Sequence, residues 1–165
     1  MHSRSAYLLV GATAALLWLA APAGATFPGQ NGKIFYSSNL AGPTRDLYRI
    51  NPDGTSATRL TGLTAPFDQG DEDKPDVSPD GKTVALVFES DDPNAADEYV
   101  IYLINRDGSN PRQVAVGSDP AWSPDGTKIA YTSISDTTGY QLGVMNADGT
   151  GQHLITTETD ITQGN

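Results

Sequence analysis

The sequence predicts an all-β fold, an incomplete β-propeller of about three four-stranded antiparallel blades. Turn motifs recur at the period of about 40–50 residues that is typical of propeller blades. The Ser-Pro-Asp-Gly turn at Ser78–Gly81 returns 45 residues later at Ser123–Gly126. The stretches between the turns are rich in β-branched and aromatic residues, as strands are. Beyond residue 25 no stretch shows the apolar period of 3.6 that indicates a helix, so almost no helix is expected there.

The N-terminal residues predict a signal peptide at 1–25 rather than a part of the fold. Arg4 precedes an apolar run from Ala6 to Ala21, and Ala23–Ala25 is a cleavage sequence of small residues. The run is shorter than the ~20 residues that a membrane-spanning helix needs. We therefore expect cleavage after Ala25 and export to the periplasm or the extracellular space, with an uncleaved N-terminal anchor as the alternative.

Residues 26–165 are predicted to form one domain of propeller repeats, with blades at about 27–62, 75–116 and 120–157. The third blade has the clearest pattern, with strands expected at 121–123, 128–133, 141–146 and 152–156. The second blade repeats this pattern, with strands expected at 76–78, 83–89, 99–105 and 112–116. In the first blade the opening strand has decayed around Phe27–Gly32, and the remaining strands are expected at 33–38, 46–51 and 57–61.

Turns that end in Asp-Gly separate many of these strands. Pro presets φ at the second position of the Ser-Pro-Asp-Gly turn, and Gly tolerates a positive φ at its end. An Asp in such a turn accepts hydrogen bonds from nearby backbone. We therefore interpret the turn aspartates as structural residues: Asp53, Asp80, Asp107, Asp125 and Asp148.

Apolar positions coincide when the three copies are aligned on their turns. The aligned sets are Ile34, Val84 and Ile129; Tyr36, Leu86 and Tyr131; and Leu60, Val114 and Ile155. A blade has too little core of its own, so repeats of this kind are stable only when neighbours stack. The alignment therefore predicts that successive blades bury these side chains against one another.

On these residues the chain resembles the TolB-like β-propeller repeats, a family related to Trp-Asp propeller repeats. Pro120–Tyr131 and Leu142–Gly149 match the two halves of the family's repeat unit, and Pro75–Leu86 matches the first half with Val77 in place of Trp. The resemblance implies a propeller fold. The family's namesake works in the periplasm with peptidoglycan-associated lipoprotein and other envelope proteins, so the resemblance also implies protein partners.

Composition excludes several function classes. The formal net charge is −10, which disfavours nucleic acid and anionic membrane surfaces as partners. There is no cysteine, and His153 is the only histidine beyond the predicted signal peptide, so neither a zinc site nor a Ser-His-Asp triad is indicated. His153 is expected to be an exposed strand residue. We predict no enzymatic activity and no cofactor.

The carboxylates away from the Asp-Gly turns are the candidate binding residues. Antiparallel strands place the connections between strands two and three, and between blades, at one end of each blade, and the acidic clusters fall in those connections. The candidate acidic rim is Asp68, Asp71, Glu72, Asp73, Asp91, Asp92, Asp97 and Glu98, with Asp76 beside it. Calcium prefers such oxygen ligands, and the candidates for it are Asp71, Asp73, Asp91 and Asp92. A basic docking partner and a solvated loop are the other interpretations.

These observations predict an exported, non-enzymatic binding or scaffold module that contacts a protein partner through the acidic rim. Self-association through open blade edges is a further expectation, because unpaired strands invite pairing. Two alternatives remain: the N-terminal propeller segment of an exported peptidase-type enzyme, and a truncated remnant. No Gly-x-Ser-x-Gly nucleophile elbow accompanies the repeats.

Overall fold

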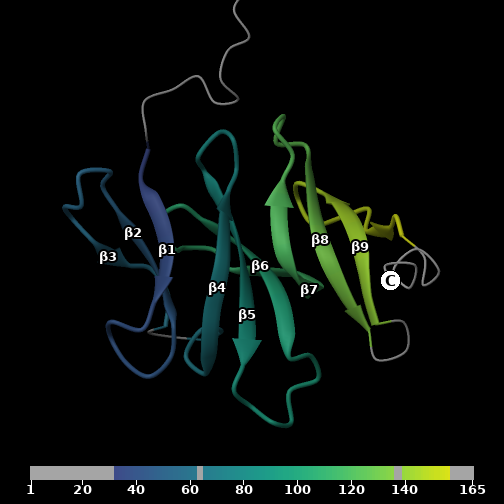
Figure 1. Ribbon diagram of the computed structural model, residues 1–165, viewed down its shortest axis with the longest axis horizontal. Helices are drawn as coiled ribbons and strands as arrows, with labels where there is room; N and C mark the ends of the chain where they lie inside the picture. Colours follow the sequence, from purple (N-terminus) through teal and green to yellow (C-terminus); the bar gives the residue numbers. More distant parts are fainter. Residues whose placement is uncertain (1–31, 63–64, 136–138, 157–165) are drawn as a thin grey trace, which may run out of the picture.

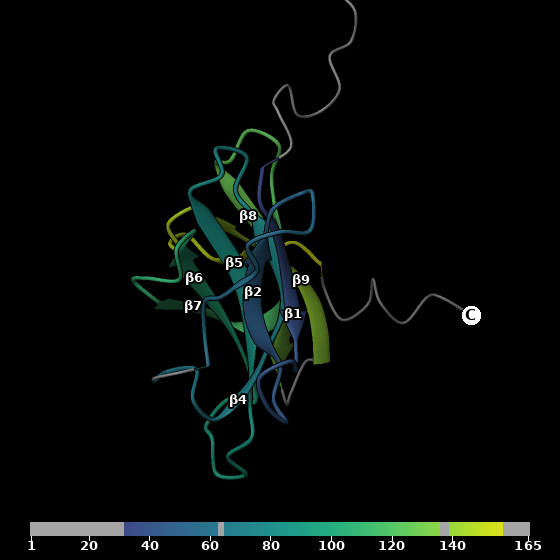
Figure 2. The same ribbon diagram turned by 90° about the vertical axis from the view of Figure 1, so that its left-hand side faces the viewer.

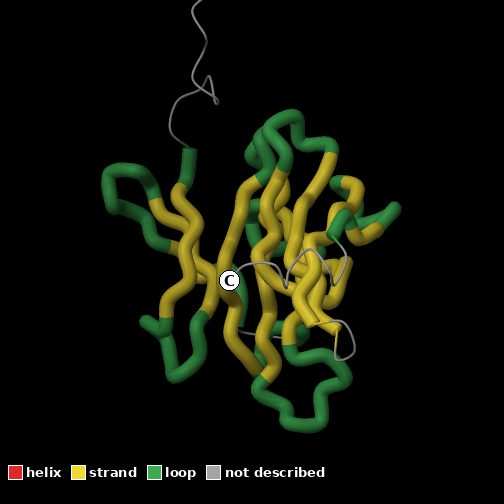
Figure 3. The backbone as a smooth tube through the Cα atoms, turned by 45° about the vertical axis from the view of Figure 1, so that its right-hand side comes forward, coloured by secondary structure: helices red, strands yellow, loops and turns green. Residues whose placement is uncertain are grey.

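The computed structural model describes residues 32–62, 65–135 and 139–156, so the predicted signal peptide lies outside the described residues. The described chain is all-β, as predicted, with turns and loops between strands and no helix (Figure 3). Its strands are β1 (Ile34–Ser38), β2 (Asp46–Ile50), β3 (Thr58–Arg59), β4 (Gly70–Val77), β5 (Thr83–Ser90), β6 (Tyr99–Asn105), β7 (Arg112–Trp122), β8 (Lys128–Ser135), β9 (Gly139–Asn146) and β10 (His153–Leu154). Within the described ranges, no helical segment has the length and apolar character that a membrane crossing requires.

The strands form antiparallel meanders. β1, β2 and β3 make a three-stranded sheet, and β4 to β10 make a continuous sheet in which each strand pairs with the next. β7 belongs to two blades, because residues 112–116 pair with β6 while residues 117–122 pair with β8. The second blade is therefore β4 to β7 and the third is β7 to β10. The decayed opening strand predicted around Phe27–Gly32 lies, apart from Gly32, outside the described residues.

Gly117 marks the point where β7 passes from one blade to the next. Its φ is 147°, and a Cβ there would lie 2.2 Å from the carbonyl oxygen of Thr132. That separation is far below a van der Waals contact, so only glycine lets the strand turn against β8. Because β7 changes its partner from β6 to β8 at Gly117, its first half belongs to the second blade and its second half to the third.

Hydrophobic side chains pack between successive blades. One cluster joins the first and second blades, and includes Leu47 of β2 with Val84 and Leu86 of β5. The other joins the second and third blades, and includes Leu103 of β6 with Tyr131 of β8. Both faces of β5 are buried, because the middle blade has a neighbour on each side. Burial of apolar area between blades is the main stabilising contribution.

The two ends of the blades carry different connections (Figure 1). The Asp-Gly turns share one end, the turn end, where the Arg106 N–H donates to the Lys82 carbonyl (2.8 Å) and the Ala147 N–H donates to the Thr127 carbonyl (3.0 Å). The β1–β2 connection (residues 39–45) and the β5–β6 connection (residues 91–98) lie at the opposite end, which we call the acidic end. A view turned by 90° shows the same separation (Figure 2).

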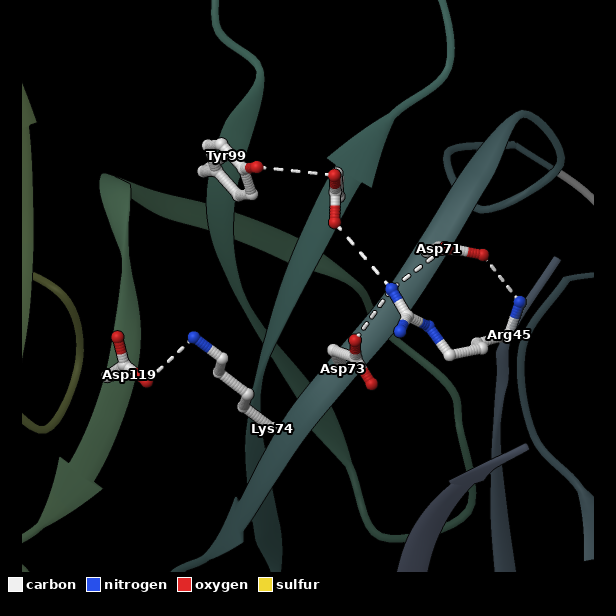
Figure 4. A network of polar contacts seen from close by, with 7 residues as sticks. Arg45, Asp71, Asp73, Lys74, Tyr99 and Asp119 are labelled. Atoms are coloured by element: carbon white, nitrogen blue, oxygen red, sulfur yellow. Dashed lines mark hydrogen bonds and ion pairs between the residues drawn. The ribbon is translucent and has the colours of Figure 1, made fainter. Parts of the chain in front are cut away.

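The inner strands of the second and third blades contain matching irregularities. Lys74 on β4 and Asp119 on β7 both have a positive φ, of 52° and 53°, and each lies at a break in strand register. Each residue precedes the proline of its repeat. The Lys74 ammonium lies 2.8 Å from the Asp119 carboxylate, so the two bulges connect the blades directly (Figure 4).

The structure corrects one expectation about the acidic rim. Asp71, Glu72 and Asp73 lie in β4, which begins at Gly70, rather than in a loop between blades. These residues pair in register with Glu89, Phe88 and Val87 of β5. The second blade therefore starts ahead of Pro75. The reason lies in the tertiary structure. β5 supplies backbone hydrogen-bond partners for β4, and Arg45 of the first blade compensates the charges of Asp71 and Asp73.

Candidate binding surface at the acidic end

Arg45, at the end of the β1–β2 connection, organises the carboxylates of β4. Its guanidinium Nη2 lies 2.9 Å from a carboxylate oxygen of Asp71, 2.9 Å from one of Asp73 and 3.7 Å from one of Glu89. Its backbone N–H also donates to Asp71 (2.6 Å). Figure 4 shows the guanidinium lying between Asp71 and Asp73. These two members of the acidic rim are therefore already paired, and they hold the first blade against the second.

Glu72 points in the opposite direction from its neighbours on β4 and is fully buried. The Thr61 hydroxyl donates to Glu72 Oε2 (2.6 Å), and the Glu72 N–H donates to the Arg45 carbonyl (2.8 Å). Burial raises the pKa of Glu72 to about 8, the Thr61 hydrogen bond lowers it, and the nearby Asp46 carboxylate raises it further. Glu72 is thus a protonated core residue at neutral pH, and it is not part of an exposed surface.

Asp46 on β2 is the second buried carboxylate at this junction. The Arg59 guanidinium donates to Asp46 Oδ1 (2.8 Å) and to the Gly62 carbonyl (2.9 Å). Asp46 Oδ2 and Glu72 Oε1 have no hydrogen-bond partner among the described residues. The Asp46 and Glu72 side chains both lie at the junction between the first two blades.

The rest of the acidic rim is solvent-facing. Asp68, Asp91, Asp92 and Glu98 are exposed and Asp97 is half-buried. Hydrogen bonds from the Asp91 N–H to the Gln69 carbonyl (3.3 Å) and from the Ser90 N–H to the Glu98 carbonyl (3.0 Å) gather these segments at one place. Within the described ranges, none of these five carboxylates lies in an ion pair. They form a negative surface that no described basic side chain neutralises.

A cleft of about 380 Å³ opens beside these carboxylates, between the second and third blades. Its lining is Ala96, Asp97, Glu98, Tyr99, Val116, Ile134, Ser135 and Tyr140. The Tyr99 hydroxyl donates to Glu89 (3.2 Å), and the charges of Glu89 and Glu98 raise the pKa of Tyr99. Aromatic rings next to carboxylates suit a cationic side chain, which contacts the ring faces and pairs with the acid. We name this feature the tyrosine cleft.

The turn end has a different chemistry. The carboxylates of Asp53, Asp107 and Asp148 each accept from the backbone N–H and hydroxyl of the residue two positions later. Hydrogen bonds from Ser123 and Thr127 lower the pKa of Asp125 to about 2. The interpretation of these aspartates as structural turn residues is thus confirmed by their hydrogen bonds.

The structure does not bring the four calcium candidates together. Asp71 and Asp73 lie against Arg45, whereas Asp91 and Asp92 lie on the exposed β5–β6 connection. Across the described ranges, no three His, Cys, Asp or Glu side chains are grouped to hold a metal ion. His153 is exposed on β10, as expected, and its ring nitrogen Nδ1 lies 3.1 Å from the Gly151 carbonyl.

Sequence reasoning located the exposed carboxylates but missed the residues that organise them. Arg45 lies in a connection that carries no motif, and Tyr99 and Tyr140 come from different blades. Both tyrosines occupy the same position of the repeat, at or near the start of the third strand, and both line the tyrosine cleft.

Comparison with known proteins agrees with the fold. No family model matches the chain. It is 54% identical over 37 residues to the Tol-Pal system protein TolB of Gluconobacter oxydans, a match covering 22% of this chain and 8% of that protein. It is 51% identical over 40 residues to the protein of the same name from Methylococcus capsulatus, covering 22% and 9%. These matches span less than a tenth of either relative.

Solved structures with the same fold cover more of the chain. A putative TolB from Agrobacterium tumefaciens gives a TM-score of 0.58 at 24% identity, over 75% of this chain and 45% of that one. TolB from Acinetobacter baumannii gives 0.55 at 23% identity, over 71% and 27%. An oligogalacturonate lyase in complex with manganese gives 0.53 at 19% identity, over 73% and 31%. At these identities the likeness shows the fold alone.

Proposed function

We propose that this chain, an incomplete β-propeller built from TolB-like repeats, is an exported, non-enzymatic binding module that docks a basic protein surface at its acidic end. The observation that carries the proposal is the division of the acidic rim. Arg45 compensates Asp71 and Asp73, and burial neutralises Glu72. The remaining carboxylates, Asp68, Asp91, Asp92, Asp97 and Glu98, stay exposed or half-buried and lie outside the ion pairs of the described residues.

Two further observations support a protein partner. Loops presented on a rigid scaffold commonly carry binding function, and the β5–β6 connection is such a loop. The relatives that match the repeats are named for the Tol-Pal system, a name that refers to proteins acting together. A periplasmic location agrees with the predicted signal peptide.

The test is binding of an octalysine peptide to the purified chain at low and at physiological salt. In a triple variant, Asp91→Asn, Asp97→Asn and Glu98→Gln, affinity should fall about tenfold, since three exposed ion pairs at about 0.5 kcal/mol each contribute about 1.5 kcal/mol. Added salt should weaken binding to the unaltered chain. Octaglutamate should not bind.

A matched control removes the same charge from the turn end. In the variant Asp53→Asn, Asp107→Asn and Asp148→Asn, the amide oxygens can still accept the turn hydrogen bonds. Octalysine affinity should stay within about twofold of the unaltered chain. An equal loss in both triple variants would show that net charge, and not the acidic end, attracts the peptide, which would refute the proposal.

The enzymatic alternative makes a distinct prediction. If the chain were the gating propeller of a peptidase-type enzyme, it should associate with a catalytic domain rather than with a cationic peptide. The likeness to a lyase supports only the shared fold.

A further inference from the structure

A groove at the turn end, opposite the acidic end, has no role in the function proposed above. It has a volume of about 470 Å³ and lies where the Ser78–Gly81 turn of the second blade meets the Ser123–Gly126 turn of the third. The two turns lie close together, since a Cβ on Gly126 would come 3.4 Å from Pro79 Cδ. Both walls of the groove therefore consist of the same sequence motif. We name this feature the tryptophan groove.

The indole of Trp122 lines the tryptophan groove. Trp122 is the last residue of β7, it is half-buried, and it packs against the core between the second and third blades. Its backbone N–H donates to Asp76 Oδ2 of β4 (2.7 Å), and it pairs with Ile129 of β8. The second blade has Val77 at the equivalent position of the repeat, so the junction of the first two blades has no such ring.

The two turn aspartates in the groove provide fixed hydrogen-bond acceptors. In Asp125 the hydrogen bonds from Ser123 and Thr127 all reach Oδ1, and in Asp80 those from its own turn also reach Oδ1. Neither turn uses Oδ2. The Lys82 ammonium lies 3.3 Å from Asp80 Oδ2, whereas within the described ranges Asp125 lies in no ion pair. Because the hydrogen bond from Ser123 lowers the pKa of Asp125 to about 2, this acceptor is ionised at neutral pH.

This combination of groups favours a sugar ring. The face of an indole is electron-rich and contacts the apolar C–H face of a pyranose, and a carboxylate accepts strong hydrogen bonds from the hydroxyls at the rim of the ring. A cationic side chain would find a single uncompensated carboxylate, because Lys82 already pairs with Asp80. An anionic sugar would be repelled by Asp125. The volume of the groove lies in the range of about 300–1,000 Å³ that is usual for small-molecule sites.

We infer that the tryptophan groove binds a neutral saccharide, with a sugar ring stacked on Trp122 and a hydroxyl donating to Asp125 Oδ2. The turn hydrogen bonds hold the carboxylate and the pairing of β7 with β8 holds the indole, so little conformational entropy is lost on binding. The site lies at the opposite end of the blades from the carboxylates of the acidic end. The inference therefore does not depend on the proposed function, and the two can fail separately.

The first test is fluorescence, because Trp122 is one of two tryptophans and the other, Trp18, lies in the predicted signal peptide. Trp18→Phe leaves Trp122 as the single indole of the chain. Titration with cellobiose, lactose, maltose and N,N′-diacetylchitobiose should give, for at least one of them, a saturable change in emission with a Kd of about 0.1–10 mM. Digalacturonate, which is anionic, should bind at least about tenfold more weakly. The absence of a saturable response to all four neutral disaccharides would overturn the inference.

The second test places the saccharide in the groove. Asp125→Asn keeps one oxygen for the turn hydrogen bonds but exchanges the other for an NH₂ group, and it should weaken disaccharide binding about tenfold. Asp107→Asn is the matched control, because Asp107 is an exposed turn aspartate with equivalent hydrogen bonds outside the groove, and it should bind as the unaltered chain does. An equal loss of affinity in both variants would contradict the assignment.

Trp122→Leu removes the ring but keeps an apolar contact with the core. Isothermal titration calorimetry should detect no disaccharide binding to this variant, and circular dichroism should show the strand content of the unaltered chain. Unchanged binding would overturn the inference, and Asp125→Asn, which alters an exposed side chain, tests it independently if Trp122→Leu does not fold.

Two competition measurements separate this site from the acidic end. The variant Asp91→Asn, Asp97→Asn and Glu98→Gln should bind the disaccharide as the unaltered chain does, whether or not it has lost octalysine. Octalysine should not displace the disaccharide from the unaltered chain. Displacement would identify the groove as a site for cations and would overturn the inference.

Discussion

The protonation of Glu72 makes the stability of this fold depend on pH in an unusual direction. Glu72 is fully buried at the junction of the first two blades, where burial raises its pKa from 4.5 to about 8. A carboxyl group whose pKa is higher in the folded state binds its proton more tightly when folded. This contribution to stability is complete below about pH 4.5 and is lost as the pH rises to about 8.

The size of the effect follows from the difference between the two pKa values. Each pH unit corresponds to about 1.4 kcal/mol, so the free energy of unfolding should fall by up to about 5 kcal/mol between pH 4.5 and pH 8. Asp46 and Asp71 add to the rise in pKa, whereas Arg59 and the Thr61 hydroxyl oppose it. A loss of this size is a large fraction of the stability of a typical domain.

Glu72→Gln isolates this contribution, because the amide is neutral at every pH and can accept the Thr61 hydrogen bond. Urea denaturation at pH 5, 6, 7 and 8 should give a variant whose stability relative to the unaltered chain increases steadily with pH. Glu98→Gln, which changes an exposed carboxylate, is the control and should follow the unaltered chain. Parallel stability curves for Glu72→Gln and the unaltered chain would refute the argument, since Glu72 would then titrate alike in both states.

Two further substitutions test the elements that join the blades. Gly117→Ala introduces a Cβ about 2.2 Å from the Thr132 carbonyl oxygen at a φ of 147°, so thermal or urea denaturation should show a loss of about 2–4 kcal/mol. Gly42→Ala, which meets no atom within 4 Å, should stay within about 0.5 kcal/mol, and an equal loss in both would contradict the steric reason. Arg45→Ala removes the cation shared by three carboxylates and should cost about 1–2 kcal/mol at low salt, with a smaller loss at 1 M salt. Lys82→Ala, at an exposed pair, should have almost no effect on the same measurement.

Most strands were predictable because the features that define them, a turn motif and an alternating pattern, lie within a few residues of one another in the sequence. The strand from Lys128 to Ser135 follows a Ser-Pro-Asp-Gly turn and alternates between its two faces, and both properties are visible in the sequence. The same holds for the turn aspartates, whose hydrogen-bond partners lie two residues away. The inter-blade packing of Tyr131 followed from its repeated position.

The acidic rim was only partly predictable, because its charges are compensated over long sequence distances. Nothing near Asp71 indicates that Arg45, 26 residues earlier, pairs with it. Glu72 has the composition of a solvated loop residue, yet the strand pairing with β5 turns it into the core. Acidic residues that are adjacent in the sequence therefore lie in different environments: Glu72 is in the core, whereas Asp71 and Asp73 are half-buried and paired with Arg45.

The sequence by itself determined the propeller class, the strand and turn pattern and the repeat register, because periodic apolar positions and Asp-Gly turns act over a few residues. Only the tertiary structure decided which carboxylates are buried, paired or free. Those outcomes depend on contacts between separate blades, because strand direction, burial and the positions of Arg45 and Arg59 determine the surroundings of each carboxylate.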